Sequence, residues 1–232
     1  MRSKRKGTGA LAGALAVVAA LAVASLAFAT VTIYKESFAR KGSVRALSQF
    51  SGGKRCAIAH HRKSRTLRVR VLRRDVLCAY RPPVVADSAV PDHEINVAVR
   101  LAKKQTPRAV RRKSYVAVLL RVDKNSHYQF RVFPHSGRYE LLRVPNGGGG
   151  GFPVTGKSDA VKGIDATNKV RLRAFGARIE AFVNGTRLAD VTDADPGQVD
   201  GRRIAFGVGS LKDVKGGPLA VFKSVNVRVP DP

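Results

Sequence analysis

The sequence is poor in several residue types that build common functional sites. It contains no tryptophan, and its two cysteines are accompanied by only five histidines, which are scattered. A structural zinc site takes four cysteine or histidine ligands at close spacing, which this composition does not supply. Acidic residues are also scarce, with 16 against 43 lysines and arginines. The composition therefore indicates no cofactor.

The two cysteines, Cys56 and Cys78, are separated by 21 residues. In an oxidising compartment an even pair without any other thiol is most simply a disulfide. The pair flanks Leu67–Leu72, so a bridge would tie the strand before this segment to the strand after it. Two free buried thiols are the alternative.

The beginning of the chain has the pattern of a membrane-targeting segment. Four basic residues precede an uncharged run, Gly7–Tyr34, and the central part of this run, Ala10–Ala29, is almost entirely alanine, leucine and valine. A helix of about 20 apolar residues spans a bilayer, and basic residues before it hold the N-terminus in the cytoplasm. We expect one transmembrane or signal helix in residues 1–34, a linker in residues 35–45 and a folded domain in residues 46–232.

Two fates of this segment are compatible with the sequence. Retention makes the protein a single-pass protein of the cell membrane, with its domain outside the cytoplasm. Ala27-Phe28-Ala29 has the small-x-small form of a signal-peptidase site, so cleavage after Ala29 would give a secreted domain. Because the apolar run is longer than the usual signal-peptide core of about 7–15 residues, retention is the favoured interpretation.

The net charge of +27 is unevenly distributed. Residues 35–121 carry 22 basic and 5 acidic side chains, whereas residues 122–232 carry 17 basic and 11 acidic ones. A positive field of this kind favours anionic partners such as acidic glycans and phosphate polymers. The alternative is that the charge only keeps the surface soluble.

From Leu67 onward, apolar residues recur with a period of two, which is typical of half-buried strands. Ile95–Leu101 repeats the pattern, and Tyr115–Val122 is apolar on both faces, as expected of a central strand. Asn184-Gly185 is a strong hairpin signal, because a type I′ turn needs positive φ at both positions. Many short strands with Gly and Pro turns, and no amphipathic helix, predict an all-β, two-sheet antiparallel sandwich.

Four stretches carry a family resemblance. They are Val118–Asp123 followed by Ser126–Val132, then Gly137–Leu141, then Asn168–Leu172 leading to Ala181–Gly185, and finally Ile204–Gly209 with Phe222–Val227. In order and spacing they resemble the concanavalin A-like lectin/glucanase jelly roll, in the branch of laminin G-like modules and 3-keto-disaccharide hydrolase-type domains. The resemblance implies a jelly roll over Glu94–Val229. It leaves the activity open, because this fold hosts lectins, hydrolases and interaction modules.

Hydrolases of this fold use two carboxylates on one strand, and retaining chemistry needs them about 5 Å apart. The chain has no Glu-x-Asp-x-x-Glu pattern, and its four glutamates, Glu36, Glu94, Glu140 and Glu180, are isolated. We therefore expect no catalytic residues and no enzyme activity.

Four aspartates, Asp190, Asp193, Asp195 and Asp200, lie close together in a turn-rich stretch. Calcium takes six to eight oxygen ligands, and laminin G-like relatives often bind it. Aspartate is also a common turn former, which is the favoured explanation here.

Outward-facing arginines are the candidate ligand-binding residues. Arg68 and Arg70 alternate with apolar residues of one expected strand, and Arg171 and Arg173 do so in another. Guanidinium groups on a sheet face can hold carboxylate or phosphate groups bidentately. A solvated strand face is the alternative.

The expected function is non-catalytic binding of envelope glycans or anionic polymers by a membrane-tethered or secreted domain. Nucleic acid is not an expected partner, because the interleaved exposed aromatics of single-strand binders are missing. A carbohydrate-active hydrolase of the same fold and a structural or protein-interaction ectodomain are the alternatives.

Overall fold

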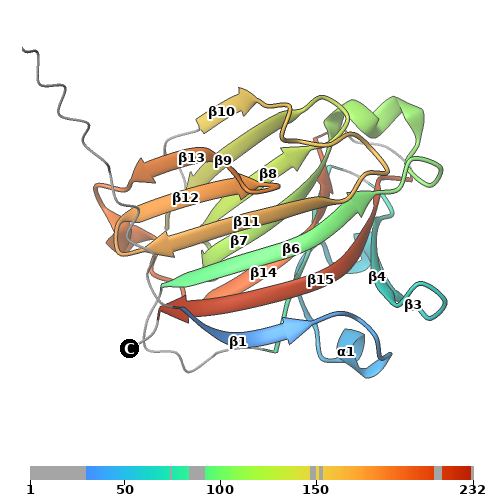
Figure 1. The fold of residues 1–232 in the computed structure, drawn as a ribbon, viewed down its shortest axis with the longest axis horizontal. Helices are drawn as coiled ribbons and strands as arrows, with labels where there is room; N and C mark the ends of the chain where they lie inside the picture. The colour runs from blue at the N-terminus through green and yellow to red at the C-terminus, as the bar shows by residue number, and fades with distance from the viewer. Residues whose placement is uncertain are drawn as a thin grey trace, which may run out of the picture.

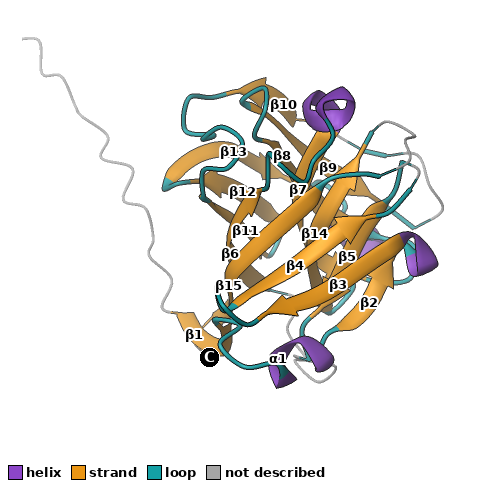
Figure 2. Cartoon of the chain, turned by 90° about the vertical axis from the view of Figure 1, so that its right-hand side faces the viewer, coloured by secondary structure: helices purple, strands orange, loops and turns teal. Residues whose placement is uncertain are grey.

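Two antiparallel sheets form the described part of the chain in the computed structural model, which covers residues 30–73, 75–83, 92–146, 150–151, 154–211 and 216–230. Sheet A lies in front in Figure 1 and sheet B behind it, and Figure 2 shows the arrangement from the side. Sheet A has the order β13 (Thr186–Thr192), β12 (Arg178–Val183), β11 (Asn168–Phe175), β6 (His93–Leu101), β15 (Leu219–Pro230), β4 (Thr66–Val71) and β3 (Cys56–His61), and β1 (Thr30–Glu36) also pairs with β15.

Sheet B is built mainly from the middle of the chain. Its order is β10 (Val154–Lys157), β9 (Arg138–Val144), β8 (His127–Phe133), β7 (Ser114–Val122), β14 (Arg203–Ser210), β5 (Leu77–Arg81) and β2 (Ser48–Ser51). Within the described residues, helical structure is short and consists of α1 (Gly42–Arg45) and three 3₁₀ turns, η1 (Gly53–Arg55), η2 (Arg108–Lys113) and η3 (Pro196–Gln198). The predicted all-β sandwich is therefore confirmed.

The main core fills the space between the sheets, because each alternating strand turns one apolar face inward. Phe206 of β14 and Phe222 of β15 meet there across the two sheets, with ring centroids 5.0 Å apart. The predicted hairpin turn is also present. Asn184 and Gly185 join β12 to β13 with φ values of 51° and 92°, as a type I′ turn requires.

The N-terminal boundary differs from the expectation. Residues 30–34 belong to β1, and the expected linker, residues 35–45, completes β1 and forms α1. Phe38, within that range, is fully buried in the main core. The cause is the pairing of β1 with β15, a partner that lies at the far end of the sequence. The folded domain therefore includes residues 30–45, and residues 35–45 do not form a linker.

The remainder of the expected export segment, residues 1–29, lies outside the described residues. Across the residues that are described, no helix is long and apolar enough to cross a membrane.

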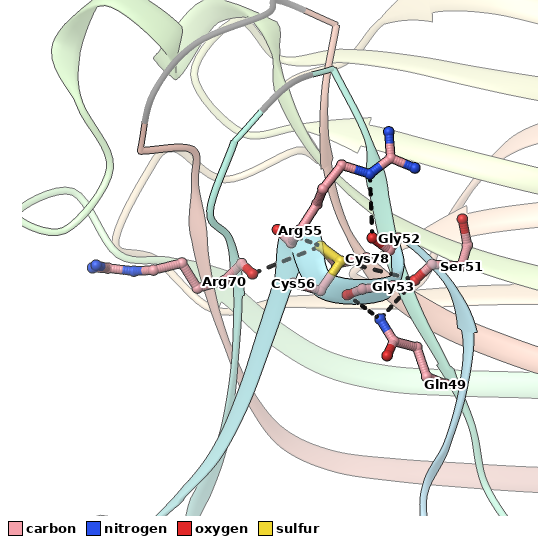
Figure 3. Close-up of a disulfide and its surroundings, with 8 residues drawn as sticks. All are labelled: Gln49, Ser51, Gly52, Gly53, Arg55, Cys56, Arg70 and Cys78. Atoms are coloured by element: carbon pink, nitrogen blue, oxygen red, sulfur yellow. Dashed lines mark hydrogen bonds between the residues drawn. A yellow bond between two sulfur atoms is a disulfide. The ribbon is translucent and has the colours of Figure 1, made fainter.

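The predicted disulfide is present between Cys56 and Cys78, whose Cα atoms are 5.6 Å apart. It links β3, at the edge of sheet A, to β5 in sheet B, so it crosses between the layers (Figure 3). Gly52 lies against the bridge with a φ of 99°, and a Cβ on it would be only 2.0 Å from the Cys56 sulfur. This position needs glycine for both its backbone conformation and its packing.

Replacing Cys56 with alanine is expected to lower the free energy of unfolding by about 3 kcal/mol, as the chain-entropy model gives for a loop of this size. Hydrogen exchange should increase most in β3 and β4, because β3 pairs only with β4 among the described strands. Cys78→Ala is the matched variant and should have the same effect. Two thiols that react freely with an alkylating reagent, in wild-type protein isolated without reductant, would contradict the bridge.

Candidate functional site

All four predicted arginines lie on the outer face of sheet A. Arg68 and Arg70 belong to β4, and Arg171 and Arg173 belong to β11, each alternating with buried core residues. The strands β6 and β15 lie between β4 and β11, so the two pairs are about 14 Å apart across the sheet at the usual strand spacing. The structure therefore places them on one face but not in one ladder.

The pair on β11 is engaged with acidic residues of the same face. A nitrogen of Arg171 is 3.8 Å from Glu94, and its guanidinium lies 3.8 Å from the ring centre of Phe182. Arg173 forms an ion pair with Glu180, which is only 2% exposed. Much of the charge of this pair is thus balanced within the molecule.

Glu180 is surrounded by cations from three strands. Besides Arg173, it contacts Arg187 at 3.1 Å and Arg178 at 3.4 Å. Burial alone would raise the pKa of Glu180, but the hydrogen bonds from Arg173 and Arg187 outweigh it and hold the pKa below its usual value. This carboxylate is ionised at neutral pH, and its ion pairs link the side chains of β11, β12 and β13 at this edge of the sheet.

The two arginines on β4, in contrast to those on β11, have no acidic partner among the described residues. No aspartate or glutamate of the described residues lies within ion-pair distance of Arg68 or Arg70. A nitrogen of Arg70 is 3.5 Å from the Gln105 carbonyl oxygen. Both arginines line a recess of about 220 Å³, which we call the arginine recess; its other lining residues are Ala57, Ala59, Gln105 and Leu219.

A second hollow lies in the middle of the same face, where sequence reasoning had placed no site. Strand register sets Arg171, Asn96, Asn226 and Lys35 directly opposite one another on β11, β6, β15 and β1. Two adjoining cavities of about 230 and 170 Å³ follow this row and share Asn96 and Lys169. We call the two cavities together the asparagine groove; Ala98, Phe182, Gly185, Ser224 and Val225 complete its lining.

The asparagine groove combines neutral polar groups with cations. Asn96, Asn226 and Ser224 offer amide and hydroxyl groups, and the buried Asn226 Oδ1 has no hydrogen-bond partner among the described residues. Lys35 and Arg171 stand at the two ends of the row, about 14 Å apart at the usual strand spacing. Such a groove can take hydroxyl groups at its amides and anionic groups at Lys35 and at Lys169, which are both exposed.

The outer face of sheet B is built differently because the sheet curls. The rings of Phe50 on β2 and His127 on β8 are 6.1 Å apart, although β5, β14 and β7 lie between these strands. A flat sheet would separate them by about 19 Å. Small buried residues, Ala79, Ala117 and Ala205, occupy the bottom of this curl.

Large side chains of the protein itself fill the curl. Tyr115 and Phe133 are 3% and 0% exposed, and the guanidinium groups of Arg131 and Arg138 lie over their rings at 5.0 and 4.1 Å. Burial lowers the pKa of His127 to about 4, so its imidazole is neutral at neutral pH. The outer face of sheet B is thus a second, smaller core, whereas the outer face of sheet A carries the two hollows.

The aspartate cluster has a structural explanation. Asp193 accepts hydrogen bonds from Tyr128 Oη, from Arg143 Nε at 2.7 Å and from the Asp195 backbone N–H at 3.0 Å. Asp190 is held by Arg178 and Arg187, each at 2.7 Å. Within the described ranges, no group of three His, Cys, Asp or Glu side chains is placed to hold a metal ion.

The fold is similar to several solved bacterial proteins. A protein of unknown function with a galectin-like fold from Bacillus subtilis matches with a TM-score of 0.61 at 11% identity, over 86% of this chain and 97% of that one. The carbohydrate-binding module CBM66 from Bacillus subtilis matches with a TM-score of 0.52 at 14% identity, over 77% and 92%. The laminarinase catalytic domain from Thermotoga maritima matches with a TM-score of 0.60 at 7% identity, over 88% and 99%.

The fold is a galectin-like and glucanase-like jelly roll. The resemblance to concanavalin A-like lectins and glucanases is thereby confirmed at the level of fold. No protein-family model matches the chain, and no curated protein sequence matches it. Since the similar structures include both a binding module and hydrolases, the fold by itself assigns no activity.

The acid stability of the protein should depend on Asp193. Burial alone would raise its pKa, but the hydrogen bonds from Tyr128, the Asp195 N–H and Arg143 hold the pKa below its usual value. A depressed carboxyl pKa contributes stability above the unfolded-state value of about 3.9 and loses it as pH falls through the folded-state value. The free energy of unfolding, measured with urea, should therefore be steady near neutral pH and fall below about pH 4.

Asp193→Asn should lower stability at pH 7 by about 3 kcal/mol, because Arg143 keeps a charge without its partner. The difference from wild type should shrink as pH falls below about 4, because the unfolded wild-type chain then binds a proton at Asp193 and the contribution of the lowered pKa is lost. The exposed Asp159 gives the matched control, Asp159→Asn. Equal pH profiles for wild type and Asp193→Asn would contradict this role.

Proposed function

We propose that this protein is an exported, non-catalytic domain that binds an acidic glycan of the cell envelope in the asparagine groove. The observation that carries the proposal is the row of Arg171, Asn96, Asn226 and Lys35 across four strands of sheet A. The amides, together with the exposed Lys35 and Lys169 that line the same groove, match a chain of sugar rings that carries hydroxyl groups and carboxylates. The fold similarity to a carbohydrate-binding module supports the same class of ligand.

The cationic surroundings of Glu94 and Glu180 favour binding over hydrolysis. Glu94 and Glu180 lie on either side of Arg173, opposite it on the neighbouring strands of the same face. Glu94 also contacts Arg171 and Arg228, at 3.8 and 4.0 Å. A glycosidase acid needs a raised pKa to donate its proton at neutral pH, and this cationic surrounding instead lowers the pKa of Glu180.

The location outside the cytoplasm is part of the proposal. The apolar run that ends at Ala29 directly precedes β1 in the sequence, and the disulfide suits an oxidising compartment. We propose that the run holds the domain at the cell membrane. The domain then begins immediately after the apolar run, without the linker of residues 35–45.

Binding of a soluble carboxylated glycan, hyaluronate, to the full-length protein in non-ionic detergent should be measurable by calorimetry and should weaken with added salt. Asn96→Ala with Asn226→Ala should lower the affinity by about 30-fold, because each lost hydrogen bond contributes about 1 kcal/mol. Lys169→Gln should weaken binding, and Lys124→Gln, an exposed lysine between β7 and β8, is the matched control that should not. Equal binding of neutral dextran, or groove variants that bind like wild type, would refute the site.

Intact-mass analysis tests the retained segment. Protein recovered from the membrane fraction of the producing cells should still contain residues 1–29. A mature protein that starts at Thr30 and appears in the medium would show cleavage after Ala29 and would replace the tethered form by a secreted one.

A further inference from the structure

We infer that the arginine recess is a separate binding site for phosphodiester groups of an anionic polymer. The inference does not depend on glycan binding in the asparagine groove. Arg68 and Arg70, two residues apart on one strand, point to the same side and lie about 7 Å apart along the strand. Since no carboxylate of the described residues pairs with either arginine, their charge is available to a ligand.

The topology brings the two acid-free parts of the sequence together at this recess. Residues 37–74 contain 12 lysines and arginines and no acidic residue, and residues 95–122 contain 8 and none. The first stretch supplies β3 and β4, and the second supplies β6 from Ile95 onward and the loop that carries Gln105. The β15 strand pairs with both β4 and β6. Two cationic stretches that are distant in sequence thus become one surface.

Exposed cations extend this surface on both sides of the recess. On one side, the turn between β3 and β4 carries Arg62, Lys63 and Arg65. On the other side, the loop after β6 carries Lys103 and Lys104, next to Gln105. Asp165 pairs with Arg100 and accepts the Lys103 backbone N–H, so this carboxylate is already engaged at the base of the loop.

Both walls of the recess are fixed before any ligand arrives. The loop is held by Arg111, whose guanidinium donates to the carbonyl oxygens of Thr106 and Lys103 at 3.0 and 2.9 Å. Thr106 Oγ1 accepts the Leu219 N–H of β15 at 3.3 Å. On the opposite side, β3 is tied to sheet B by the disulfide. Preorganised walls reduce the entropy that binding costs.

The close spacing of the cations favours phosphodiester chemistry. A planar guanidinium forms paired hydrogen bonds with phosphate oxygens. A polyol phosphate carries an anion on every short link, whereas an acidic glycan spaces its carboxylates by whole sugar rings. The floor of the recess, formed by Ala57, Ala59 and Leu219, can contact the carbon atoms of such links. A phosphodiester polymer therefore fits this surface better than a carboxylated glycan.

The probe for the test is poly(glycerol phosphate), titrated by calorimetry into the full-length protein in non-ionic detergent at two salt concentrations. Replacing both Arg68 and Arg70 with glutamine should lower the affinity at least tenfold and reduce the salt slope by about two. Replacing both with lysine keeps the charge and should still weaken binding, because the bidentate contacts are lost. Lys124→Gln with Arg202→Gln removes two exposed cations elsewhere and should bind within twofold of wild type.

Melting curves show whether each variant folds. If the glutamine variant does not fold, the affinity of the lysine variant still tests the inference. Wild-type affinity in both the glutamine and lysine variants would overturn the inference. Single-stranded DNA or heparin binding as tightly as poly(glycerol phosphate) would overturn the assignment to an envelope phosphodiester. Loss of hyaluronate binding in the groove variants, with poly(glycerol phosphate) binding intact, supports two separate sites. Loss of both together would refute the separate recess.

Discussion

Sheet A depends on the pairing of β15. This strand of 12 residues pairs with β6 along one edge, and along the other edge first with β4 and then with β1. It joins the beginning, the middle and the end of the described chain in one hydrogen-bonded layer. Its register aligns Asn226 with Asn96 and Lys35, and its first residues lie beside Arg68 and Arg70. Both hollows on the outer face exist because β15 is placed in this way.

The outer faces of the two sheets differ in polarity: the outer face of sheet B is covered by apolar side chains, and the outer face of sheet A is polar and charged. Sheet B curls over small residues and covers them with Tyr115, Phe133 and Phe50, so hydrophobic burial stabilises that face as it does the main core. Sheet A keeps a polar outer face on which Glu94 and Glu180 balance many of the arginines. The cations left without a carboxylate gather where the acid-free stretches meet. The positive charge on this face is therefore concentrated by the strand topology, which brings distant segments together, and not by any single sequence motif.

Much of the sandwich followed from the sequence, and the failures have physical causes. The period-two pattern located the central strands, and the segments expected at Ile95–Leu101 and Tyr115–Val122 lie within β6 and β7. The strand β1 was missed because its apolar residues continue the preceding run and its partner is about 190 residues away. The asparagine groove was missed because cross-strand register decides it, and no single-strand pattern contains that register. The apolar second face of Tyr115–Val122 was the visible sign of the second core.

The joining of β1 to β15 also sets an order of events during folding. The strand β1 finds its partner only after residue 225 has been made, so β1 waits for about 190 further residues before it can be paired. Contacts of such long sequence separation are slow to form, because the loop between the partners must first be closed. Until then both edges of β1 are open, and an open strand edge can pair with another chain. The final assembly of sheet A is thus the step at which this protein is most exposed to aggregation.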